Sequence, residues 1–194
     1  MNRLGGKGTA LVKLMEAGFR VPKFFIVPVD AKLDPDEIAK SIKKLGAKKF
    51  AVRSSAMIED GKKHSFAGQF LTVLDVAPDK VMAAIKKVRA SGPAMSVIVQ
   101  EMIYGDESGV AFSANPVTGA LDEMVIETVK GLGDKLVSGK VTPETEIISK
   151  RGHHTGLEKI VLKIEKHFGY PVDVEWTRKG KTIYILQSRP ITTL

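Results

Sequence analysis

KFAVRSSAMIEDGKKHSFAGQFLTVL, residues Lys49 to Leu74, is the segment from which the rest of the chain is best interpreted. Two apolar runs flank a polar stretch that contains Arg53, three serines and the small-residue loop 65–69. A guanidinium beside hydroxyl groups, followed by a glycine-containing loop with free backbone N–H groups, suits a polyphosphate. The alternative is a surface hairpin with an ion-paired arginine, and the remaining sequence has to distinguish the two.

The composition is that of a globular protein with a positive net charge. The 194 residues are 43% hydrophobic and 27% charged, with a formal net charge of +8. The absence of cysteine excludes disulfides, thiolate metal sites and a thiol nucleophile. Lysines occur in short groups on predicted helix faces and only 6% of residues are aromatic, so we expect solvated helices and no nucleic-acid partner. Because the sequence has no long apolar run and no apolar signal core, we expect a cytoplasmic protein without a membrane partner.

A glycine-rich segment, LGGKGT at residues 4–9, precedes a predicted short helix that ends at Gly18. The segment fails the Walker pattern of a phosphate loop, because Lys7 is followed by Gly8 and no strand precedes it. A lysine between glycines at a helix N-terminus is still a candidate phosphate contact.

The remaining elements alternate between apolar strands and amphipathic helices. We predict strands at 24–27, 95–102, 109–113 and 124–126, and helices at 34–45, from 78 to about 90, up to 139, and at 157–168. Asp34 and Gly46 are the cap and the stop of the second helix. Residues 147–156 predict a surface loop. The strand 95–102 emerges from the core at Gln100 and Glu101, where it could present main-chain groups to a base.

Glu127 follows a predicted strand and precedes the glycines of segment 131–133. A carboxylate in this place suggests a metal or ribose contact, and a helix-capping role is the alternative.

Residues 171–189 predict a β-hairpin with a second organised site. Asp173 and Glu175 alternate with apolar residues, so they share one face of a strand. A two-residue turn separates Gln187 from Glu175, whereas a three-residue loop, or a bulge elsewhere, places Glu175, Gln187 and Arg189 on one face. There, Glu175 and Gln187 would be oxygen ligands for a hard cation and Arg189 would hold phosphates. The alternative is an exposed polar row on a half-buried hairpin.

Five motifs occur in the order found in a known family. They are LGGKG at 4–8, VRSSAMIED and SFAGQ within 52–69, SGVAFSANPVTG at 108–119, ET, GLGD and SGKVTPE within 127–144, and DVEW and LQSRP within 173–190. In these motifs the chain resembles the nucleotide-binding domain of phosphoenolpyruvate synthases and pyruvate phosphate dikinases, which rifampicin phosphotransferases share. The resemblance covers nearly the whole chain.

The resemblance implies an α+β fold of the ATP-grasp class, in which two lobes hold ATP between them and a glycine-rich loop closes over the phosphates. We expect these lobes at residues 1–97 and 98–194. The resemblance also implies roles for matching residues: Lys7, Arg53 and Arg189 at phosphates, Gly68 and Thr72 in the covering loop and its strand, Gln100, Glu101 and Met102 at the adenine edge, Glu175 and Gln187 at Mg²⁺, and Glu127 at ribose or metal.

The chain also departs from the family pattern. Family members carry a histidine on a separate mobile domain that accepts phosphoryl from ATP. None of His64, His153, His154 and His167 lies in the sequence context of that carrier. The chain ends at Leu194, where the family continues into a linker and the carrier domain, and it is shorter than the usual ATP domain, mostly within residues 28–50 and around 147–156.

We therefore expect an Mg²⁺-ATP-dependent phosphotransferase module whose acceptor histidine lies on a separate phosphohistidine or pyruvate-binding domain or subunit. Two alternatives stay open, namely a non-catalytic ATP-binding regulatory module and a direct small-molecule kinase. The joint presence of Arg53, Glu175, Gln187 and Arg189 favours catalysis, because a pure binder could lose its metal ligands.

Overall fold

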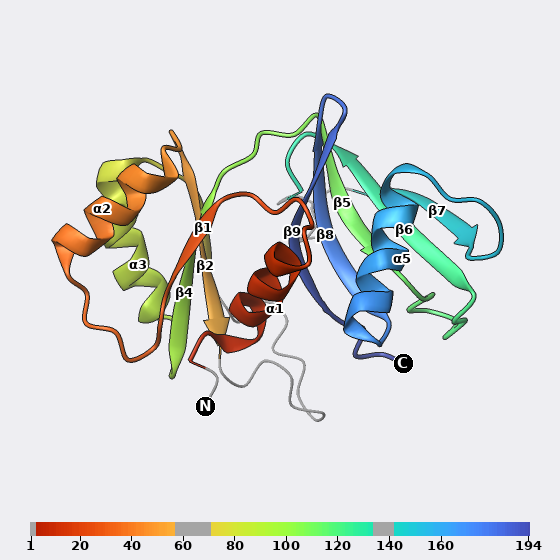
Figure 1. The fold of residues 1–194 in the computed structure, drawn as a ribbon, viewed down its shortest axis with the longest axis horizontal. Helices are drawn as coiled ribbons and strands as arrows, with labels where there is room; N and C mark the ends of the chain where they lie inside the picture. The colour runs from red at the N-terminus through yellow and green to blue at the C-terminus, as the bar shows by residue number, and fades with distance from the viewer. Residues whose placement is uncertain (1–2, 57–70, 134–141) are drawn as a thin grey trace. The chain divides into compact units, whose positions relative to one another are not determined.

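The computed structural model describes residues 3–56, 71–133 and 142–194, and the chain divides into two compact units (Figure 1). The first unit consists of Met1–Val12 and Pro22–Met102, and the second of Lys13–Val21 and Ile103–Leu194. Each unit has its own antiparallel sheet and its own hydrophobic core. The functional lobes expected at residues 1–97 and 98–194 stay a prediction.

The first unit is a four-stranded sheet with the order β1-β4-β2-β3. Its strands are β1 Phe24–Val27, β2 Phe50–Ala56, β3 Thr72–Val76 and β4 Met95–Glu101, and its helices are α2 Pro35–Leu45, the 3₁₀ helix η1 Pro78–Lys80 and α3 Val81–Arg89. The core joins Ile38 of α2 and Ile85 of α3 to Val52 and Val97 of the sheet. Because alternate strand residues point to opposite faces, these helices cover one face, and the other carries Arg53 and Ser55 together with apolar residues such as Ile98.

The boundaries of α2 follow from its sequence. The Asp34 carboxylate accepts hydrogen bonds from the N–H groups of Asp36, at 2.8 Å, and Glu37, at 3.4 Å. Gly46 ends the helix in the left-handed conformation, with φ of +67°, and its N–H donates to the Ile42 carbonyl. The predicted cap and stop are therefore both confirmed.

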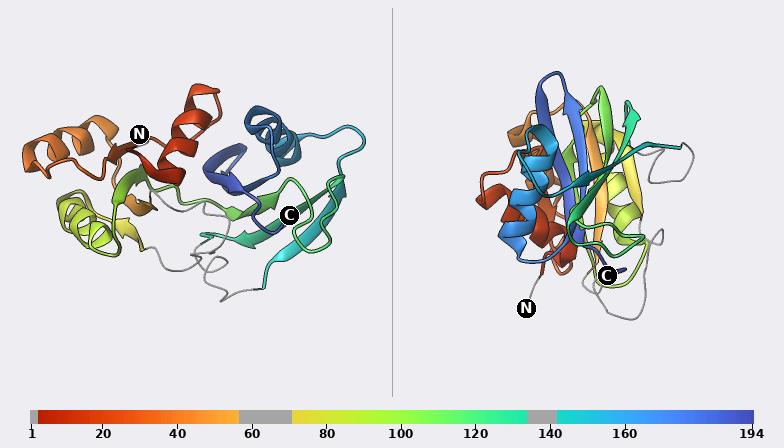
Figure 2. Two further views of the ribbon diagram at one scale, coloured as in Figure 1. Left: turned by 90° about the horizontal axis from the view of Figure 1, so that it is seen from below. Right: turned by 90° about the vertical axis from the view of Figure 1, so that its right-hand side faces the viewer.

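The second unit is a five-stranded sheet with the order β7-β6-β5-β8-β9. The strands are β5 Glu107–Phe112, β6 Glu123–Lys130, β7 Glu144–Ser149, β8 Val172–Lys179 and β9 Thr182–Pro190, and the helix α5 spans Gly156–Phe168. Figure 2 shows α5 lying on one face of this sheet. The core joins Val161 and Ile164 of α5 to Met124, Val174 and Trp176 of the strands.

Three predictions about the strands of the two units were wrong. Glu127 lies within β6 rather than at its end, because the strand continues to Lys130. Residues 147–149 belong to β7 rather than to a loop. This strand pairs on one side only, with β6, so Ile147 stays 63% exposed and the sequence lacks a burial pattern. Gln100 is only 1% exposed, because β4 is a central strand with β1 and β2 on its two sides.

The helix α1 spans Gly5–Glu16, so the glycines that were expected in a loop before the helix lie in its first turn. The predicted short helix up to Gly139 falls largely in residues 134–141, outside the described residues. No helix in the described part of the chain combines the length and the apolar character needed to span a bilayer.

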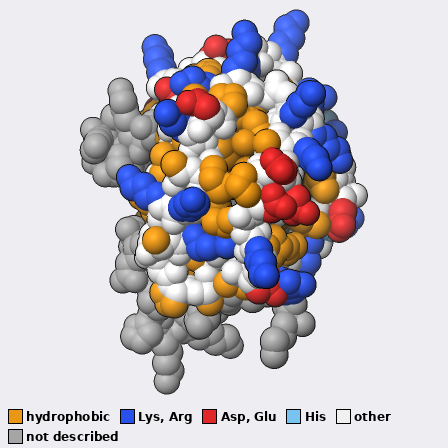
Figure 3. Space-filling view, turned by 90° about the vertical axis from the view of Figure 1, so that its left-hand side faces the viewer, with side chains coloured by type: hydrophobic (Ala, Val, Ile, Leu, Met, Phe, Trp, Pro, Cys, Tyr) orange, Lys and Arg blue, Asp and Glu red, His pale blue; other side chains and the backbone are white. Residues whose placement is uncertain are grey.

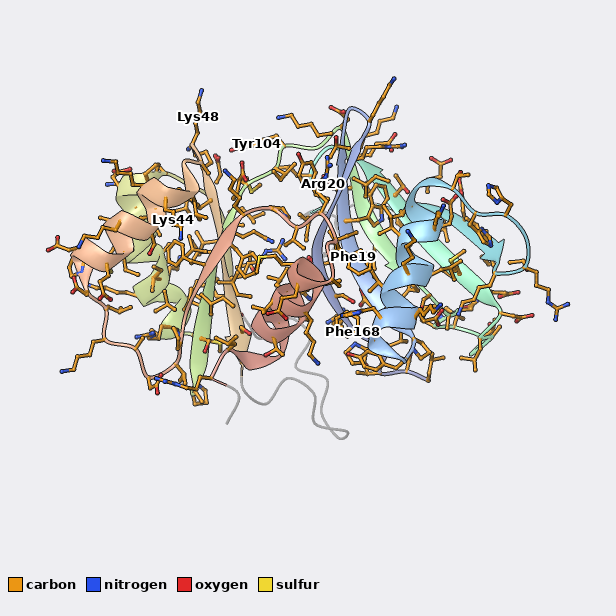
Figure 4. The ribbon with its side chains drawn as sticks, in the orientation of Figure 1. Phe19, Arg20, Lys44, Lys48, Tyr104 and Phe168 are labelled. Carbon is orange, nitrogen blue, oxygen red and sulfur yellow. The ribbon has the colours of Figure 1, made fainter. Side chains whose placement is uncertain are left out.

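The lysines Lys44 and Lys48 of the first unit are exposed (Figure 4). Figure 3 shows the end of the first unit that carries α2 and α3, where lysine and arginine side chains surround a patch of hydrophobic ones.

Gly5 is required by a close approach as well as by its backbone conformation. Its φ is +72°, and a Cβ atom there would lie 2.4 Å from both the carbonyl oxygen and the Oγ of Ser55. Gly18 has a similar φ of +79°, but nothing lies within 4 Å of its Cβ position.

We predict that Gly5→Ala lowers the free energy of unfolding by about 2 to 4 kcal/mol, because backbone strain and the clash with Ser55 add together. Gly18→Ala is the matched control and should cost only about 1 kcal/mol, from strain alone. Urea unfolding of both variants measures the difference, and equal losses would contradict the close packing of α1 against β2.

Candidate functional site

The register of the β8–β9 hairpin decides which side chains share a face. Lys179 pairs with Thr182, so the turn contains two residues, Gly180 and Lys181. A β-bulge between Trp176 and Glu175 then shifts the register. The bulge shifts the pairing of the two strands by one residue, which the two-residue turn alone does not do. It is therefore the second of the two routes by which the sequence could bring the predicted ligands together.

Beyond the bulge, Glu175 pairs directly with Gln187, and Asp173 pairs with Arg189. Residues that pair directly across antiparallel strands have Cβ atoms about 4.5 to 5.5 Å apart. The predicted metal ligands and the predicted phosphate clamp, Arg189, therefore lie in adjacent positions on one face. This face is opposite to the one that carries Val174 and the core under α5.

Glu127 extends the same row across the sheet. It pairs with Val110 of β5, and Val110 pairs with Glu175 of β8. With two strand spacings between them, the Cα atoms of Glu127 and Glu175 lie about 10 Å apart. A ligand on this face can therefore meet a carboxylate at each end of the row, but Glu127 is not an immediate neighbour of the Glu175–Gln187 pair.

Arg189 is bound to a carboxylate of the same face. Its Nε donates a hydrogen bond to Asp173 Oδ2 at 2.8 Å. The Asp173 side chain is 8% exposed, whereas the Arg189 side chain is 54% exposed. Burial raises the pKa of the Asp173 carboxyl, Arg189 opposes that rise, and the charges of Glu175 and Glu127 add to it.

The Glu175–Gln187 pair has the chemistry of a partial magnesium site. Gln187 is 3% exposed and Glu175 is half-buried, so both side chains are partly enclosed by their neighbours. Within the described residues no three His, Asp or Glu side chains are grouped as a metal cluster. Mg²⁺ is commonly held by one or two carboxylates together with water and substrate phosphates, so a pair of oxygen ligands fits it when a nucleotide supplies the others.

In the first unit, three residues predicted to contact the nucleotide, Arg53, Thr72 and Gln100, lie on the sheet face away from α2 and α3. Arg53 of β2 pairs with Thr72 of β3 and, on its other side, with Ile98 of β4. Gln100 lies two residues along β4 from Ile98, so its side chain joins the same face. Gly68 lies outside the described residues.

Ser55 connects this face to Lys7. Its Oγ accepts a hydrogen bond from the Gly8 N–H at 2.9 Å and donates one to the Leu4 carbonyl at 2.8 Å. Because Ser55 is two residues from Arg53 on β2, it shares that residue's face and ties the first turn of α1 to it. The structure thus brings the motifs LGGKG and VRSS together, and Ser55 is a positioning residue that the sequence reasoning did not single out.

Two backbone N–H groups at the end of β4 already donate hydrogen bonds within the protein. The Glu101 N–H donates to the Lys23 carbonyl at 2.8 Å, and the Met102 N–H donates to the Lys49 carbonyl at 3.0 Å. Any adenine contact by these two residues therefore has to use groups other than these N–H donors.

The described histidines lie elsewhere. His154 Nε2 is 3.1 Å from the Lys150 carbonyl, and His167 stacks edge-on between Phe19 and Phe168. His167 also lines a cavity of about 390 Å³ with the following residues: Lys13, Glu16, Ala17, Phe168 and Tyr170. Two of the lining residues, His167 and Phe168, belong to α5, which packs on the face opposite to Glu175.

Solved structures with the same fold define the class of protein. The chain matches D-alanine–D-alanine ligase from Bacillus anthracis complexed with ATP with a TM-score of 0.58 and 14% identity, over 97% of this chain and 55% of that chain. It matches the ATP-grasp ligase PsnB complexed with minimal precursor, Mg and ADP with a TM-score of 0.52 and 13% identity, over 95% of this chain and 48% of that chain. The fold is therefore an α+β fold of the ATP-grasp class.

The family follows from the sequence comparison. The family described as pyruvate phosphate dikinase, AMP/ATP-binding domain, matches residues 35–93, 92–158 and 152–194. The chain belongs to this family.

The similar curated proteins include a phosphoenolpyruvate synthase and two proteins named as phosphotransferases. Phosphoenolpyruvate synthase of Pyrococcus furiosus is 34% identical, over 82% of this chain and 29% of the relative. An uncharacterized phosphotransferase of Bacillus subtilis is 30% identical and covers 98% of this chain and 33% of the relative. Rifampicin phosphotransferase of the same organism is 34% identical, over 75% of this chain and 23% of the relative. The chain thus spans about a third or less of the length of these relatives.

The raised pKa of Asp173 predicts how stability changes with pH. The folded state binds this proton more tightly than the unfolded chain does. The contribution to stability is therefore present below the ordinary pKa of 3.8 and is lost as pH rises through the raised folded-state value.

Asp173→Asn removes this titration. We expect the free energy of unfolding of the variant, relative to the wild type, to increase from about pH 4 to pH 7, as measured by urea unfolding. A relative stability that falls over this range would mean that the attraction of Arg189 outweighs burial.

Proposed function

We propose that the chain is an Mg²⁺-ATP-dependent phosphotransferase module that donates phosphoryl or pyrophosphoryl from ATP to a histidine on a separate domain or subunit. The observation that carries the proposal is the pairing of Glu175 with Gln187 beside the Asp173–Arg189 pair on one sheet face. Membership in a family of AMP/ATP-binding domains supports the nucleotide, and the phosphotransferase names of two relatives support the reaction class.

In this proposal the second unit holds the metal and the terminal phosphates. Glu175 and Gln187 supply oxygen ligands, and Arg189 binds the terminal phosphates through its guanidinium. Bound Mg²⁺ would neutralise charge that develops on the transferred phosphoryl group. Glu127, at the far end of the row, contacts ribose or metal.

The first unit supplies further cations and the base site. Lys7, held by the Ser55 hydrogen bonds in the first turn of α1, and Arg53 on β2 bind phosphates. Catalysis is then mainly a matter of position and charge, because these groups stabilise charge on the phosphates without forming bonds to them. The remaining proposed nucleotide contacts are Gly68 and Thr72 of the covering loop and its strand, and Gln100, Glu101 and Met102 at the adenine edge.

The proposed acceptor is a histidine outside this chain. A histidine on another domain or subunit fits the greater length of the relatives, of which this chain spans about a third or less. A direct small-molecule kinase is the second candidate, and the similarity to a rifampicin phosphotransferase favours it.

We predict that the wild type binds Mg²⁺-ATP with micromolar affinity in calorimetry, and that Glu175→Ala and Arg53→Ala each weaken binding at least about tenfold, because each removes a charged ligand. The matched controls are Glu107→Ala and Arg178→Ala. These residues form an ion pair between β5 and β8, on the face opposite to Glu175, so their loss should change affinity by less than about twofold.

Nucleotide analysis of the same samples tests the transfer step. AMP that appears only when a phosphohistidine domain is added would support transfer to a separate acceptor, and ADP formed with a small molecule would support the second candidate. No binding of Mg²⁺-ATP by the wild type would overturn both.

A further inference from the structure

The Asp173–Arg189 pair connects a buried carboxylate to an exposed guanidinium on the face that carries Glu175 and Gln187. We propose that Asp173 is a positioning residue that orients Arg189 toward the terminal phosphates of ATP. This inference rests on the proposed function and adds to it a residue that touches neither nucleotide nor metal.

The hydrogen bond has the geometry that such a role requires. Asp173 accepts from Nε of Arg189 at 2.8 Å, rather than from its two terminal nitrogens. A planar guanidinium that is fixed through Nε cannot turn its plane freely, whereas the paired terminal nitrogens are the ones that match a phosphate in a two-point contact. The bond therefore limits the orientation of the fork.

The two partners also differ in burial: the carboxylate is buried and the arginine is exposed, as a positioning role for the carboxylate requires. Asp173 is fixed in the sheet with 8% of its side chain exposed, and Arg189 extends outward with 54% exposed. A long exposed arginine otherwise loses considerable rotamer freedom when it binds a ligand. A hydrogen bond to a buried carboxylate already restricts the rotamers of Arg189, so less conformational entropy is lost on binding and the affinity for phosphate is higher.

The charge of the surrounding face favours this arrangement. Glu175 and Glu127 both act on Asp173 electrostatically, so the face holds three carboxylates against the cation of Arg189. Negative charge on this face would repel the phosphates of ATP. The hydrogen bond from Arg189 compensates the charge of Asp173, so it lowers the repulsion that phosphates would meet on this face.

The test is a double-mutant cycle read by calorimetry with two ligands, Mg²⁺-ATP and AMP. Asp173→Ala should weaken Mg²⁺-ATP binding about tenfold and change AMP binding less than about twofold, because AMP lacks the terminal phosphates. In an Arg189→Ala background, Asp173→Ala should have an effect of less than about twofold, since the group through which it acts is gone.

Two further variants keep the result interpretable. Asp173→Asn retains the side-chain volume and one acceptor oxygen, so it should fold and give an intermediate loss. Glu107→Gln breaks the similar carboxylate–arginine pair on the opposite face, and it should leave both affinities unchanged.

Each outcome decides the matter. Non-additive losses that are confined to Mg²⁺-ATP support the positioning role. Additive losses in the cycle, or an equal loss of AMP affinity, overturn it while the proposed function stands. Absence of Mg²⁺-ATP binding in the wild type overturns both.

Discussion

The register between β8 and β9 is the constraint on which the candidate site depends. Because side chains alternate with a period of two, a displacement by one residue would send Gln187 and Arg189 to the core face under α5. The β-bulge between Trp176 and Glu175 prevents this by placing one extra residue, Leu186, on β9. It allows the tip of the hairpin to keep a two-residue turn, while the base of the hairpin pairs Glu175 with Gln187.

In both sheets the two faces have different roles. In each, one face packs against helices with apolar residues, such as Val52 in the first unit and Val174 in the second. The other face collects the polar residues of the family motifs, with Arg53 and Thr72 on the first sheet and Glu175 and Gln187 on the second. An apolar core on one side thereby holds the polar groups of the other side in fixed positions, and such preorganisation lowers the cost of binding a charged ligand.

Local signals in the sequence predicted much of this fold, and contacts distant in sequence account for the rest. The boundaries of α2 follow from Asp34 and Gly46, and the shared face of Asp173 and Glu175 follows from strand alternation. The bulge could be stated only as one of two routes, because the sequence of the hairpin does not specify where an extra residue is placed. Likewise, β7 escaped prediction because an edge strand with exposed Ile147 carries no burial pattern, and the role of Ser55 depends on a contact with Leu4 and Gly8 more than forty residues away.

The most direct test of the account is a crystal structure with a non-hydrolysable ATP analogue and Mn²⁺ in place of Mg²⁺, located by its anomalous signal. We expect one Mn²⁺ peak about 2 Å from an oxygen of Glu175 and an oxygen of Gln187, with Arg189 on the terminal phosphate. A nucleotide bound with its metal elsewhere, and with Glu175 and Gln187 uninvolved, would contradict it.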